Sequence, residues 1–422
     1  MMDHADSAAS AAYADVLIVG GGQAGTQVAV GLRSAGFEGS IRILEAGGHF
    51  PYERPPLTKA YLRGEREAED LLFRAEAFWQ ESAISIELGQ SVVEIDRAAH
   101  QVHCGTDRTF GYGRLVWTAG GSARRLPLGT GIDGVLSVRT LDDADLLRAH
   151  SADIHDVVVI GGGFIGLEAA AVLREKGARV TILEALDRLL ARVTSPPVSE
   201  YFASLHRFHG SDVRTGVVVE EITSDGDGAV TGVRLADGEV VPADLVLVGI
   251  GLVPNIEPLR ASGIICSNGV DTDADGRTSD PDVFAAGDCA NRVNAYSNGR
   301  QVRLESVPNA VEVGKGVAEA ITGGGERTEA APWFWSHQFD TKLQTVGLFN
   351  DYDDFVVRGD VESGSFTVAY LREGVVIALD CINSTRDFAQ GKSLVPARRT
   401  VAVDLLADTS IGLKDLAGAA RT

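Results

Sequence analysis

Two stretches of the chain decide its fold: DVLIVGGGQAGTQVAVGLRSAGFEGSIRILEA at residues 15–46 and DVVVIGGGFIGLEAAAVLREKGARVTILEA at residues 156–185. Each begins with an aliphatic run, passes through three consecutive glycines, continues at helical spacing to a glycine, and closes on glutamate after a second apolar run. A change from strand-like to helix-like periodicity at a glycine turn is typical of a βαβ unit. The repeat therefore predicts an α/β protein with two Rossmann-like dinucleotide-binding domains.

The glycine spacing has a physical reason. The first glycine of G-x-G-x-x-G makes the strand-to-helix turn, the second lets a pyrophosphate approach the backbone, and the third allows close helix–strand packing. An acid then closes each unit, Glu45 in the first and Glu184 in the second, where it can accept from ribose hydroxyls. The glycines with this spacing are Gly20, Gly22 and Gly25, and then Gly161, Gly163 and Gly166.

One such pattern alone is explained equally well by an ordinary glycine-rich turn. Two complete units with strand, helix and acid in register favour two bound dinucleotides instead. The common chemistry that needs two dinucleotides in one chain is hydride transfer between a flavin and a nicotinamide.

Composition limits the other classes of function. The chain has 422 residues, 45% of them hydrophobic, and 38 basic against 59 acidic residues give a net charge of −21. So acidic a chain is a poor candidate for nucleic-acid binding or for an anionic membrane surface. No apolar run approaches the roughly 18 residues of a membrane-spanning helix, and the first residues do not resemble a secretory signal. At about 150 residues per domain, the length predicts three domains.

The cysteines indicate a reducing environment. Cys104, Cys266, Cys289 and Cys381 are widely separated, and no C-x-x-C pair occurs. This spacing predicts no metal–thiolate cluster and argues against a disulfide scaffold. We therefore expect a cytoplasmic protein without a bound metal.

Other segments complete the two units and add a third region. The segments 197–210 and 308–323 read as helices that start near proline and stop at glycine. Residues 332–422 change to aromatic and alternating stretches, which predicts a small α+β domain. Further strands that run into glycine turns are expected at 115–121, 244–251 and 282–288.

Several segments are more specific than a dinucleotide fingerprint. They are YERPPLTKAYL (52–62), VVIGGGFIGLEAAA (158–171), RVTSPPVSEYF (192–202), GIGLVPN (249–255), TSDPDVFAAGDCA (278–290), ESVPNA (305–310) and PWFWSHQFD (332–340). With these the chain resembles the FAD-dependent, NADH-oxidising ferredoxin reductases of the glutathione-reductase structural class, of the putidaredoxin reductase and biphenyl dioxygenase reductase type. The apoptosis-inducing flavoproteins share this architecture but match less closely.

The resemblance implies a function and a domain organisation. NADH would reduce FAD, and the electrons would pass one at a time to a [2Fe-2S] ferredoxin that serves a cytochrome P450 or a Rieske-type oxygenase. The implied domains are a discontinuous FAD-binding domain at 1–122 and 252–330, an NAD-binding domain at 123–251, and a C-terminal α+β domain at 331–422.

The resemblance also assigns cofactor contacts, position by position. On the FAD side these are Gly20, Gly22, Ala24 and Gly25 at the pyrophosphate, Glu45 at the ribose, Arg54 and Lys59 in the flavin-side loop, Val92 and Ala119 near the adenine and backbone, Arg139 from the interdomain crossover, Asp288 at the ribityl chain, and Val307 and Trp335 at the isoalloxazine. On the nicotinamide side they are Gly161, Gly163, Phe164, Ile165 and Gly166 at the pyrophosphate turn, Glu184 and Arg192 at the ribose, and Gly251 and Glu305 near the nicotinamide.

Two positions depart from the family pattern. The first unit closes on Glu45 followed by Ala46, where most relatives have glycine followed by an acid, so the ribose contact comes from a shifted strand end or is missing. His337 stands where the family usually has aspartate, and an imidazole there replaces a fixed negative charge near the flavin edge.

We predict an active-site charge pair of Lys59 and Glu168. Glu168 follows the last glycine of the second fingerprint and is expected in the first turn of its helix, facing the nicotinamide. The resemblance places Lys59 in the loop near flavin N5, where its ammonium would neutralise Glu168. The alternatives are an ordinary surface lysine and an acid that only stabilises a helix dipole.

Three further signals have simpler explanations. The acidic run from Asp271 to Asp282 imitates a calcium loop, but an acidic surface turn fits its flanking strands better. His206 and His209 lack a third ligand and are expected to be packed or solvated. Cys289 has no partner cysteine and is expected to be a small packing residue.

Two alternative functions remain open at this stage. One is a reductase for rubredoxin or a small-molecule acceptor, and the other is an NADH-responsive flavoprotein with an interaction role. The missing C-x-x-C argues against disulfide reductases. Glu184 predicts a preference for NADH over NADPH, because it would repel a 2′-phosphate. A basic patch for an acidic ferredoxin is expected among Arg54, Lys59, Arg63, Arg66 and Arg74.

Overall fold

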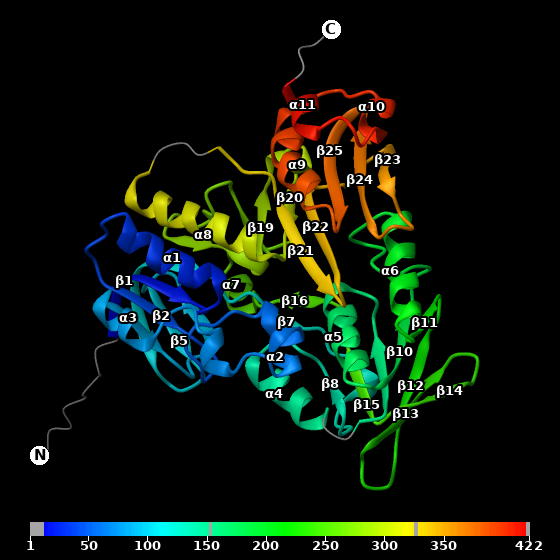
Figure 1. The fold of residues 1–422 in the computed structure, drawn as a ribbon. Helices are drawn as coiled ribbons and strands as arrows, with labels where there is room; N and C mark the ends of the chain where they lie inside the picture. Colours follow the sequence, from blue (N-terminus) through cyan, green and yellow to red (C-terminus); the bar gives the residue numbers. More distant parts are fainter. Residues whose placement is uncertain (1–11, 152–153, 325–327, 419–422) are drawn as a thin grey trace, which may run out of the picture. The chain divides into compact units, whose positions relative to one another are not determined.

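The chain folds around the two glycine-turn units that its sequence repeats. A computed structural model describes residues 12–151, 154–324 and 328–418. They divide into two compact units (Figure 1). Unit 1 comprises Met1–Glu53, Leu72–Gly121 and Pro254–Glu329, and unit 2 comprises Arg54–Leu71, Ser122–Val253 and Ala330–Thr422. The three domain boundaries implied by the resemblance stay predictions.

Unit 1 contains the first βαβ unit and the sheet built on it. Its elements are β1 (Ala12–Val19), α1 (Gln23–Ser34), β2 (Ile41–Leu44), α3 (Glu76–Glu81), β3 (Ile84–Glu87), β4 (Val92–Asp96), β5 (Gln101–Cys104), β6 (Thr109–Trp117), α7 (Glu257–Ala261), β17 (Val270–Thr272), β18 (Val283–Ala285), η4 (Gly287–Cys289), β19 (Ala290–Val293), η5 (Ala295–Ser297), β20 (Gln301–Arg303) and α8 (Val307–Thr322).

The large sheet of unit 1 is mostly parallel. Its strand order is β3-β2-β1-β6-β5-β4, and β18 also pairs with β6 in parallel. Helices α1 and α8 lie side by side (Figure 1), and small residues let them approach closely. A β-carbon added at Gly31 of α1 would lie 2.9 Å from that of Ala318 on α8. Residues 16–19 of β1 and 115–117 of β6 are at most 5% exposed, as expected for strands of a parallel sheet.

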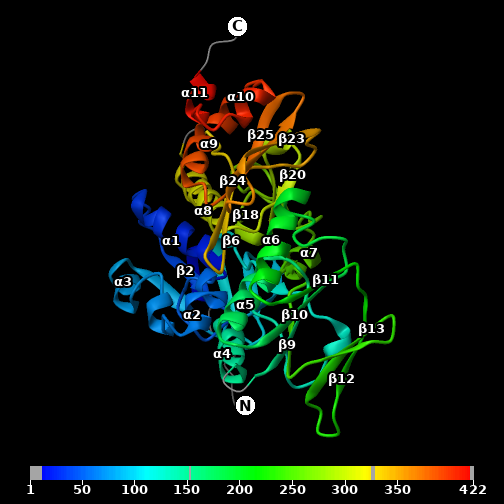
Figure 2. The same cartoon turned by 45° about the vertical axis from the view of Figure 1, so that its right-hand side comes forward.

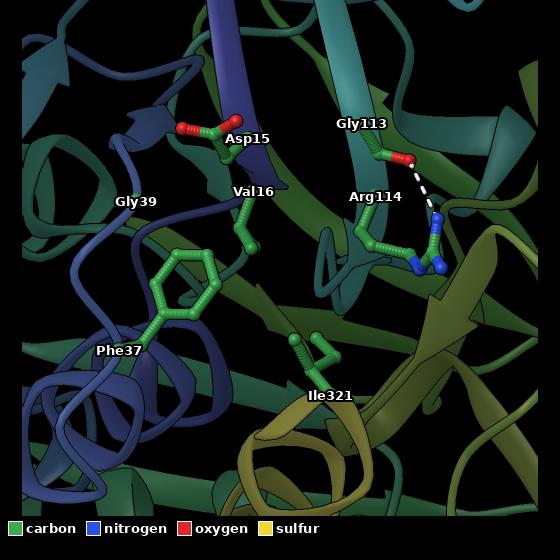
Figure 3. Close-up of a pocket in the computed structure, with 7 residues that line it drawn as sticks. All are labelled: Asp15, Val16, Phe37, Gly39, Gly113, Arg114 and Ile321. Carbon is green, nitrogen blue, oxygen red and sulfur yellow. Dashed lines mark hydrogen bonds between the residues drawn. The ribbon is translucent and has the colours of Figure 1, made fainter. Parts of the chain in front are cut away.

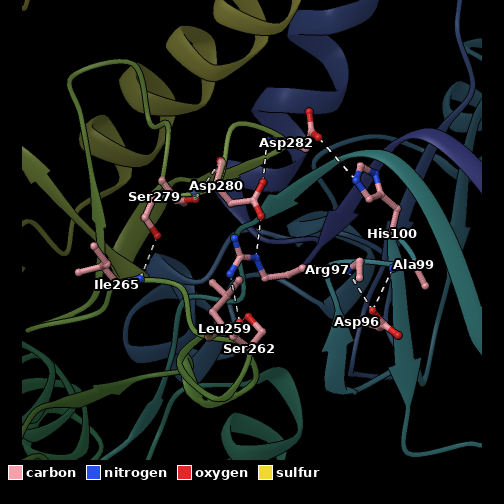
Figure 4. Close-up of polar contacts among 12 residues, drawn as sticks. Asp96, Arg97, Ala99, His100, Leu259, Ser262, Ile265, Ser279, Asp280 and Asp282 are labelled. Atoms are coloured by element: carbon pink, nitrogen blue, oxygen red, sulfur yellow. Dashed lines mark hydrogen bonds and ion pairs between the residues drawn. The ribbon is translucent and has the colours of Figure 1, made fainter.

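A polar cluster ties the β4–β5 turn to the loops after α7 (Figure 4). Arg97 Nε donates to Asp280 Oδ2 at 2.6 Å, and its Nη1 donates to the Ser262 carbonyl at 3.3 Å. His100 Nε2 lies 3.6 Å from Asp282 Oδ2. These contacts connect parts of unit 1 that are far apart in sequence.

Unit 2 contains the second βαβ unit and the C-terminal region. Its elements are η1 (Pro55–Thr58), α2 (Ala60–Arg63), η2 (Ala68–Leu71), η3 (Pro127–Gly129), β8 (Val135–Leu136), α4 (Leu141–His150), β9 (Asp156–Ile160), α5 (Phe164–Glu175), β10 (Arg179–Glu184), α6 (Pro196–Phe208), β11 (Asp212–Thr215), β12 (Val219–Ser224), β13 (Val230–Leu235), β14 (Val240–Pro242), β15 (Leu245–Val248), β21 (Trp333–Gln338), β22 (Thr341–Gly347), β23 (Asp354–Asp360), β24 (Ser365–Arg372), β25 (Val375–Ile382), α9 (Thr385–Ala397), α10 (Val403–Ala407) and α11 (Leu413–Gly418).

Unit 2 has a parallel sheet and an antiparallel sheet around a shared core. The parallel sheet has the order β11-β10-β9-β15-β8, and the antiparallel C-terminal sheet has the order β21-β22-β25-β24-β23. Val198 and Phe202 of α6 pack in the same core as Leu343 and Phe366 of the C-terminal sheet. Helix α9 packs on β22 and β25. Figure 2 shows α9 beside β25. The strands β7 (Gly121–Ala123) and β16 (Leu252–Pro254) span two of the points at which the chain passes from one unit to the other.

A buried arginine holds residues 406–411 against the C-terminal sheet. Arg358 of β23 is 3% exposed, and its Nε donates to Asp387 Oδ2 at 2.9 Å. Its two terminal nitrogens donate to backbone carbonyls of a single short segment, at Leu406, Asp408, Thr409 and Ile411. The guanidinium is therefore satisfied only when the segment that leaves α10 lies over the sheet.

These observations confirm the predicted fold class, with two dinucleotide-binding units and a C-terminal α+β region. The predicted helices at 197–210 and 308–323 correspond to α6 and α8. Among the described residues, no helix is long and apolar enough to cross a membrane.

A shallow hollow in unit 1 lies away from the predicted sites (Figure 3). Asp15, Phe37, Arg114 and Ile321 are among the residues that line it. The Asp15 carboxylate already accepts from the amide and the hydroxyl of Ser40, at 2.7 and 2.8 Å. The hollow lies near the start of β1, whereas ligands of such sheets bind at the carboxyl ends of the strands.

Candidate functional site

The first glycine turn has tight walls and one open position. Gly20 has φ +102°, and a β-carbon added there would lie 2.5 Å from the Thr118 carbonyl oxygen. A β-carbon at Gly25 would lie 2.0 Å from the Gly20 carbonyl oxygen, because the helix packs directly on the turn. At Gly22 an added β-carbon would meet no part of the described residues within 4 Å apart from its neighbours in the chain. The protein itself therefore requires Gly20 and Gly25, whereas the space at Gly22 is available to a ligand.

The second turn repeats this geometry. Gly161 has φ +106°, and its added β-carbon would lie 2.5 Å from the Gly249 carbonyl oxygen. The corresponding distance from Gly166 to the Gly161 carbonyl oxygen is 2.6 Å, while Gly163 has its nearest neighbour at 3.8 Å. The middle glycine is again the open position.

Both turns lead into a helix whose first turn has no side-chain cap. Helix α1 begins after Gly22 and α5 after Gly163, and neither N-cap accepts a hydrogen bond through a side chain. The first-turn amide groups and the positive end of the helix dipole then suit an anion. Each turn fits the pyrophosphate of a dinucleotide, so unit 1 could hold FAD and unit 2 could hold a nicotinamide dinucleotide.

The acid at the end of each unit braces its own turn. Glu45 Oε2 accepts from the Gly21 amide at 2.6 Å, and its Oε1 accepts from the Gly47 amide at 3.0 Å. Glu184 does the same with the amides of Gly162 at 2.7 Å and Leu186 at 2.8 Å. The shifted order of Glu45 and Ala46 therefore does not remove the first brace. Each carboxylate oxygen keeps a lone pair for a ribose hydroxyl.

Lys59 and Glu168 form a buried ion pair inside unit 2. Lys59 Nζ donates to Glu168 Oε2 and also to the Pro55 carbonyl at 3.2 Å. Glu168 is 2% exposed, and it accepts further hydrogen bonds from Thr58 Oγ1 at 2.9 Å and from Ser336 Oγ at 2.7 Å. The predicted contact between Lys59 and Glu168 is present, and its catalytic role stays a prediction.

The position of Glu168 on its helix differs from the expectation. Helix α5 starts at Phe164, so Glu168 is its fifth residue and lies in the second turn rather than the first. There its side chain points toward β21 and η1, which pack against α5. Donors from those two elements, rather than the helix dipole, therefore stabilise its charge.

Comparison with known proteins agrees with this geometry. The family model described as pyridine nucleotide-disulphide oxidoreductase matches residues 14–314, and the one described as reductase C-terminal matches residues 333–417. The chain belongs to this family. Within it the chain is 50% identical to a ferredoxin–NAD(P)+ reductase of Sphingomonas sp., over 92% of this chain and 94% of the relative.

Two further comparisons cover almost the whole chain. It is 47% identical to the ferredoxin reductase subunit of 5,5′-dehydrodivanillate O-demethylase from Sphingobium sp. (strain NBRC 103272 / SYK-6), over 96% of this chain and 98% of the relative. Putidaredoxin reductase in its covalent complex with putidaredoxin matches with a TM-score of 0.93 and 41% identity, over 96% of this chain and 99% of that one. The resemblance to ferredoxin reductases is confirmed.

Within unit 1, several of the predicted FAD-side residues lie around the first glycine turn. Ala24 lies in the first turn of α1, and a β-carbon added at Gly287 would approach its side chain to 2.9 Å. Asp288 follows in η4 and is therefore held beside this helix start. Ala119 follows β6, next to Thr118, which closes the turn. The other FAD-side or nicotinamide-side candidates of unit 1 are Val92 in β4, Val307 at the start of α8, and the exposed Glu305.

Within unit 2, the loop that the resemblance assigns to the flavin side carries further candidates. Arg54 Nη1 donates to the Arg139 carbonyl at 2.7 Å, so this loop and the chain before α4 are connected. Trp335 is half-buried in β21, with its ring centroid 5.6 Å from that of Trp333. The direct roles of these side chains toward FAD stay predictions.

The nicotinamide-side candidates lie around the second turn. Phe164 packs its ring against Phe334 at 4.7 Å, whereas the side chain of Ile165 is 49% exposed. Gly251 has φ +106°, a conformation that favours glycine. Arg192 is exposed, while Arg188 is occupied by the carbonyls of Thr194 and Ala191 and by the Ser199 hydroxyl.

Sequence reasoning missed three residues behind Glu168. Thr58 and Ser336 donate to its carboxylate, and Gln338 Nε2 donates to Ser336 Oγ at 3.3 Å. They lie in the two segments YERPPLTKAYL and PWFWSHQFD, which carried the resemblance. The alternation of side chains along a strand could have revealed two of them. Ser336 and Gln338 are two residues apart in β21, so they share one face of the strand, and both are buried.

The acidic run from Asp271 to Asp282, the histidine pair and Cys289 can be checked against the structure. Among the described residues, no group of three or more His, Cys, Asp or Glu side chains could hold a metal ion. Asp273 Oδ1 accepts from the amides of Asp275 and Arg277, as in an ordinary acidic turn. Cys289 is completely buried, and burial raises its pKa to about 12, which fits a packing residue.

The five residues of the predicted basic patch differ in their contacts. Lys59 pairs with Glu168, and Arg63 Nε donates to Glu175 Oε2 at 2.8 Å. Arg66 donates to the Asp70 carbonyl, and Arg74 lies 5.4 Å from the centre of the Phe78 ring. The charges of Lys59 and Arg63 are thus partly neutralised by their acidic partners. The positive charge of this group is smaller than the sequence suggests, and the basic patch stays a prediction.

Proposed function

We propose that this chain is an NADH-dependent, FAD-containing reductase that passes electrons one at a time to a [2Fe-2S] ferredoxin of a cytochrome P450 or Rieske-type oxygenase system. The observation that carries the proposal is the pair of open glycine turns, one in each unit, in a chain of the ferredoxin reductase family. The matches to a demethylase ferredoxin reductase subunit and to putidaredoxin reductase in complex with putidaredoxin support the choice of acceptor.

The protein's part in this reaction is positioning and electrostatics. When bound, FAD accepts a hydride from NADH and returns the electrons singly. The turn at Gly20–Gly25 would hold one pyrophosphate and that at Gly161–Gly166 the other. Lys59 would place a positive charge where negative charge develops on the flavin, and Glu168 fixes the direction of that ammonium.

The test is reconstitution with purified components. We expect NADH to bleach the bound flavin rapidly and a [2Fe-2S] ferredoxin from an oxygenase system to be reduced with steady turnover. Turnover should fall as ionic strength rises, because an acidic ferredoxin needs a local basic patch on a chain of net charge −21. Fast flavin reduction without ferredoxin reduction would exclude this acceptor.

Two alternatives are separated by the same assay. A rubredoxin reductase is a second candidate, because a rubredoxin–NAD+ reductase of Pseudomonas putida is 36% identical over 87% of this chain. It would prefer rubredoxin to [2Fe-2S] ferredoxin as acceptor. An NADH-responsive flavoprotein with an interaction role would accumulate a long-lived reduced complex and show little turnover with either acceptor.

The proposal includes NADH as the preferred donor and a cytoplasmic location. The fixed Glu184 carboxylate supports the first point, because its charge would repel a 2′-phosphate. Four cysteines without disulfide bonds fit the second, because a reducing compartment keeps thiols free.

A further inference from the structure

A line of polar side chains runs from Glu168 into the interior of unit 2. Ser336 Oγ donates to Glu168 Oε1 at 2.7 Å, and Gln338 Nε2 donates to Ser336 Oγ at 3.3 Å. His206 Nε2 of α6 lies 3.0 Å from Gln338 Oε1. Ser336, Gln338 and His206 are all 1% exposed or less. Each of these groups depends on its neighbours in the line, because water does not reach it.

The carboxylate fixes the direction of every hydrogen bond in this line. An ionised carboxylate can only accept, so the Ser336 hydroxyl must donate to it and must itself accept from the Gln338 amide nitrogen. Gln338 Oε1 then faces His206 and has to accept from a protonated Nε2. All the protons of the line therefore point toward Glu168.

The state of His206 agrees with this direction. Burial lowers the pKa of His206 to about 4, so its ring is neutral near pH 7 and carries one proton. With that proton on Nε2, the other nitrogen is an acceptor, and Nδ1 has no hydrogen-bond partner in the part of the chain that the structure describes. A neutral acceptor is less costly to leave unpaired than a charged donor.

We propose that Ser336 is a positioning residue for the Lys59–Glu168 pair, with Gln338 and His206 holding its hydroxyl in the donating orientation. This inference rests on the proposed function and assigns it a further residue. Lys59 and Thr58 both use Oε2 of Glu168, while Ser336 holds Oε1. Without Ser336 the Glu168 carboxylate is held through Oε2 alone, so it can turn about its last side-chain bond. The Lys59 ammonium, which otherwise donates only to the Pro55 carbonyl four residues away among the described residues, would then move with the carboxylate.

The first test compares three variants of the FAD-loaded protein by stopped-flow reduction with saturating NADH. Ser336→Ala should reduce its flavin about tenfold more slowly, because a displaced charge loses most of its effect on the reaction. Ser336→Thr keeps the hydroxyl and should reduce its flavin within about twofold of the wild-type rate, although its extra methyl group at this buried position should lower the thermal stability. The control is Ser365→Ala, which removes a hydroxyl from an exposed position of the same sheet and should behave as wild type.

The second test does not depend on catalysis. Acetic anhydride labels free amines, and mass spectrometry compares the labelling rate of Lys59 with that of exposed Lys176 in the same molecule. Lys59 should be labelled several-fold faster in Ser336→Ala and at the wild-type rate in Ser336→Thr and Ser365→Ala. A thermal unfolding curve for each variant distinguishes this local release from general loosening.

The third test asks whether Ser336 acts through Glu168. In a Glu168→Gln background, Ser336→Ala should cause little additional slowing, because the charge that Ser336 positions is gone. An undiminished effect in that background would overturn the inference, as would a Ser336→Ala variant with wild-type reduction and wild-type Lys59 labelling. These outcomes need only NADH and FAD, so a failure to reduce ferredoxin would contradict the proposed function and leave this inference standing.

Discussion

The two βαβ units are nearly identical at their glycine turns and different on the far side of their helices. Gly20 and Gly161 have φ values of +102° and +106°, and an added β-carbon would lie 2.5 Å from a carbonyl oxygen in both. Glu45 and Glu184 brace the two turns through equivalent backbone amides. This shared geometry suits a group that FAD and NADH have in common, and we propose that each turn binds a pyrophosphate.

The helices that leave the turns have different neighbours. Helix α1 packs on α8 through small residues, so a β-carbon at Gly314 would lie 3.0 Å from the Ala24 carbonyl. Helix α5 packs on β21 and η1, and there it buries Glu168 with Lys59, Thr58 and Ser336. We infer that the turn of each unit would bind a cofactor, whereas the elements packed against its helix would determine which chemistry the unit can support.

The largest expected effect separates the two kinds of glycine within the first turn. Gly25→Ala should prevent stable folding of unit 1, because its methyl group would lie 2.0 Å from a backbone oxygen and force the helix off the turn. Gly22→Ala should change the stability of the protein by no more than about 0.5 kcal/mol, because the added methyl group would meet no other part of the described residues within 4 Å beyond its neighbours in the chain. It should nevertheless weaken FAD binding, since the methyl occupies the space of the pyrophosphate.

Flavin absorbance per protein after gel filtration, together with thermal unfolding, checks this pair. The matching variant in the second turn, Gly163→Ala, should keep FAD and raise the KM for NADH. Loss of FAD from Gly163→Ala, or full FAD binding by Gly22→Ala, would break the assignment of one cofactor to each turn.

The next largest effect tests the difference between the helices. Lys59→Met should slow flavin reduction by saturating NADH about 100-fold, because the charge that develops near the flavin loses its partner. FAD content should stay near wild type. Stopped-flow bleaching measures this step apart from electron transfer to ferredoxin. An unchanged bleaching rate would make Lys59 a structural residue and remove the chemical distinction between the helices.

A third prediction concerns how the stability of the protein depends on pH through His206 and Asp380, two buried titratable groups of unit 2. The folded pKa of His206 is about 4, below its usual 6.5, so below pH 6.5 the unfolded chain binds a proton that the folded chain does not. Stability is therefore lost as the pH falls from 6.5 toward 4, by about 2 kcal/mol at pH 5. In His206→Gln, this loss should be absent.

Asp380 changes the stability of the protein with pH in the opposite direction. Burial raises its folded pKa to about 6 from 3.8, so its contribution is present below pH 3.8 and is lost as the pH rises through 6. Asp380→Asn should therefore make the acid-side loss steeper. Urea unfolding at constant excess FAD between pH 4.5 and 7 measures both slopes. Parallel curves for wild type and His206→Gln would contradict the assignment.

The smallest effect distinguishes the two braces. Glu184→Gln keeps an oxygen for the turn but loses the charge, so the preference for NADH over NADPH should fall about tenfold in kcat/KM. Glu45→Gln makes the same change in the first turn and should leave that preference as it is. A preference that shifts equally in both variants would show that the acids act only on the folding of their turns.

The sequence predicted those parts of the fold and site that local spacing controls. The G-x-G-x-x-G spacing dictates the turn, because a positive φ and contacts near 2.5 Å exclude other residues at Gly20 and Gly161. The helix at α8 followed from proline near its start and Gly323 at its end. The contact between Lys59 and Glu168 followed from the family resemblance and not from spacing.

What escaped prediction depends on packing between distant segments. Thr58 and Ser336 are more than 270 residues apart in sequence, and only the packing of η1 and β21 on the same helix brings both hydroxyls to Glu168. The second-turn position of Glu168 escaped for a simpler reason. Helix α5 begins directly after the open glycine Gly163, and a motif spacing does not specify the first helical residue.

The clamp on Arg358 has a practical consequence for modifying this protein. Four of the five acceptors that this guanidinium contacts within the described residues belong to residues 406–411, and the fifth is Asp387. Cutting the chain before Leu406 would therefore leave this buried cation with Asp387 as its remaining acceptor among the described residues, in the same sheet that contributes Ser336 to Glu168. Affinity tags or a fused redox partner should be attached beyond Gly418, so that residues 406–411 stay in place over the C-terminal sheet and keep their hydrogen bonds to Arg358.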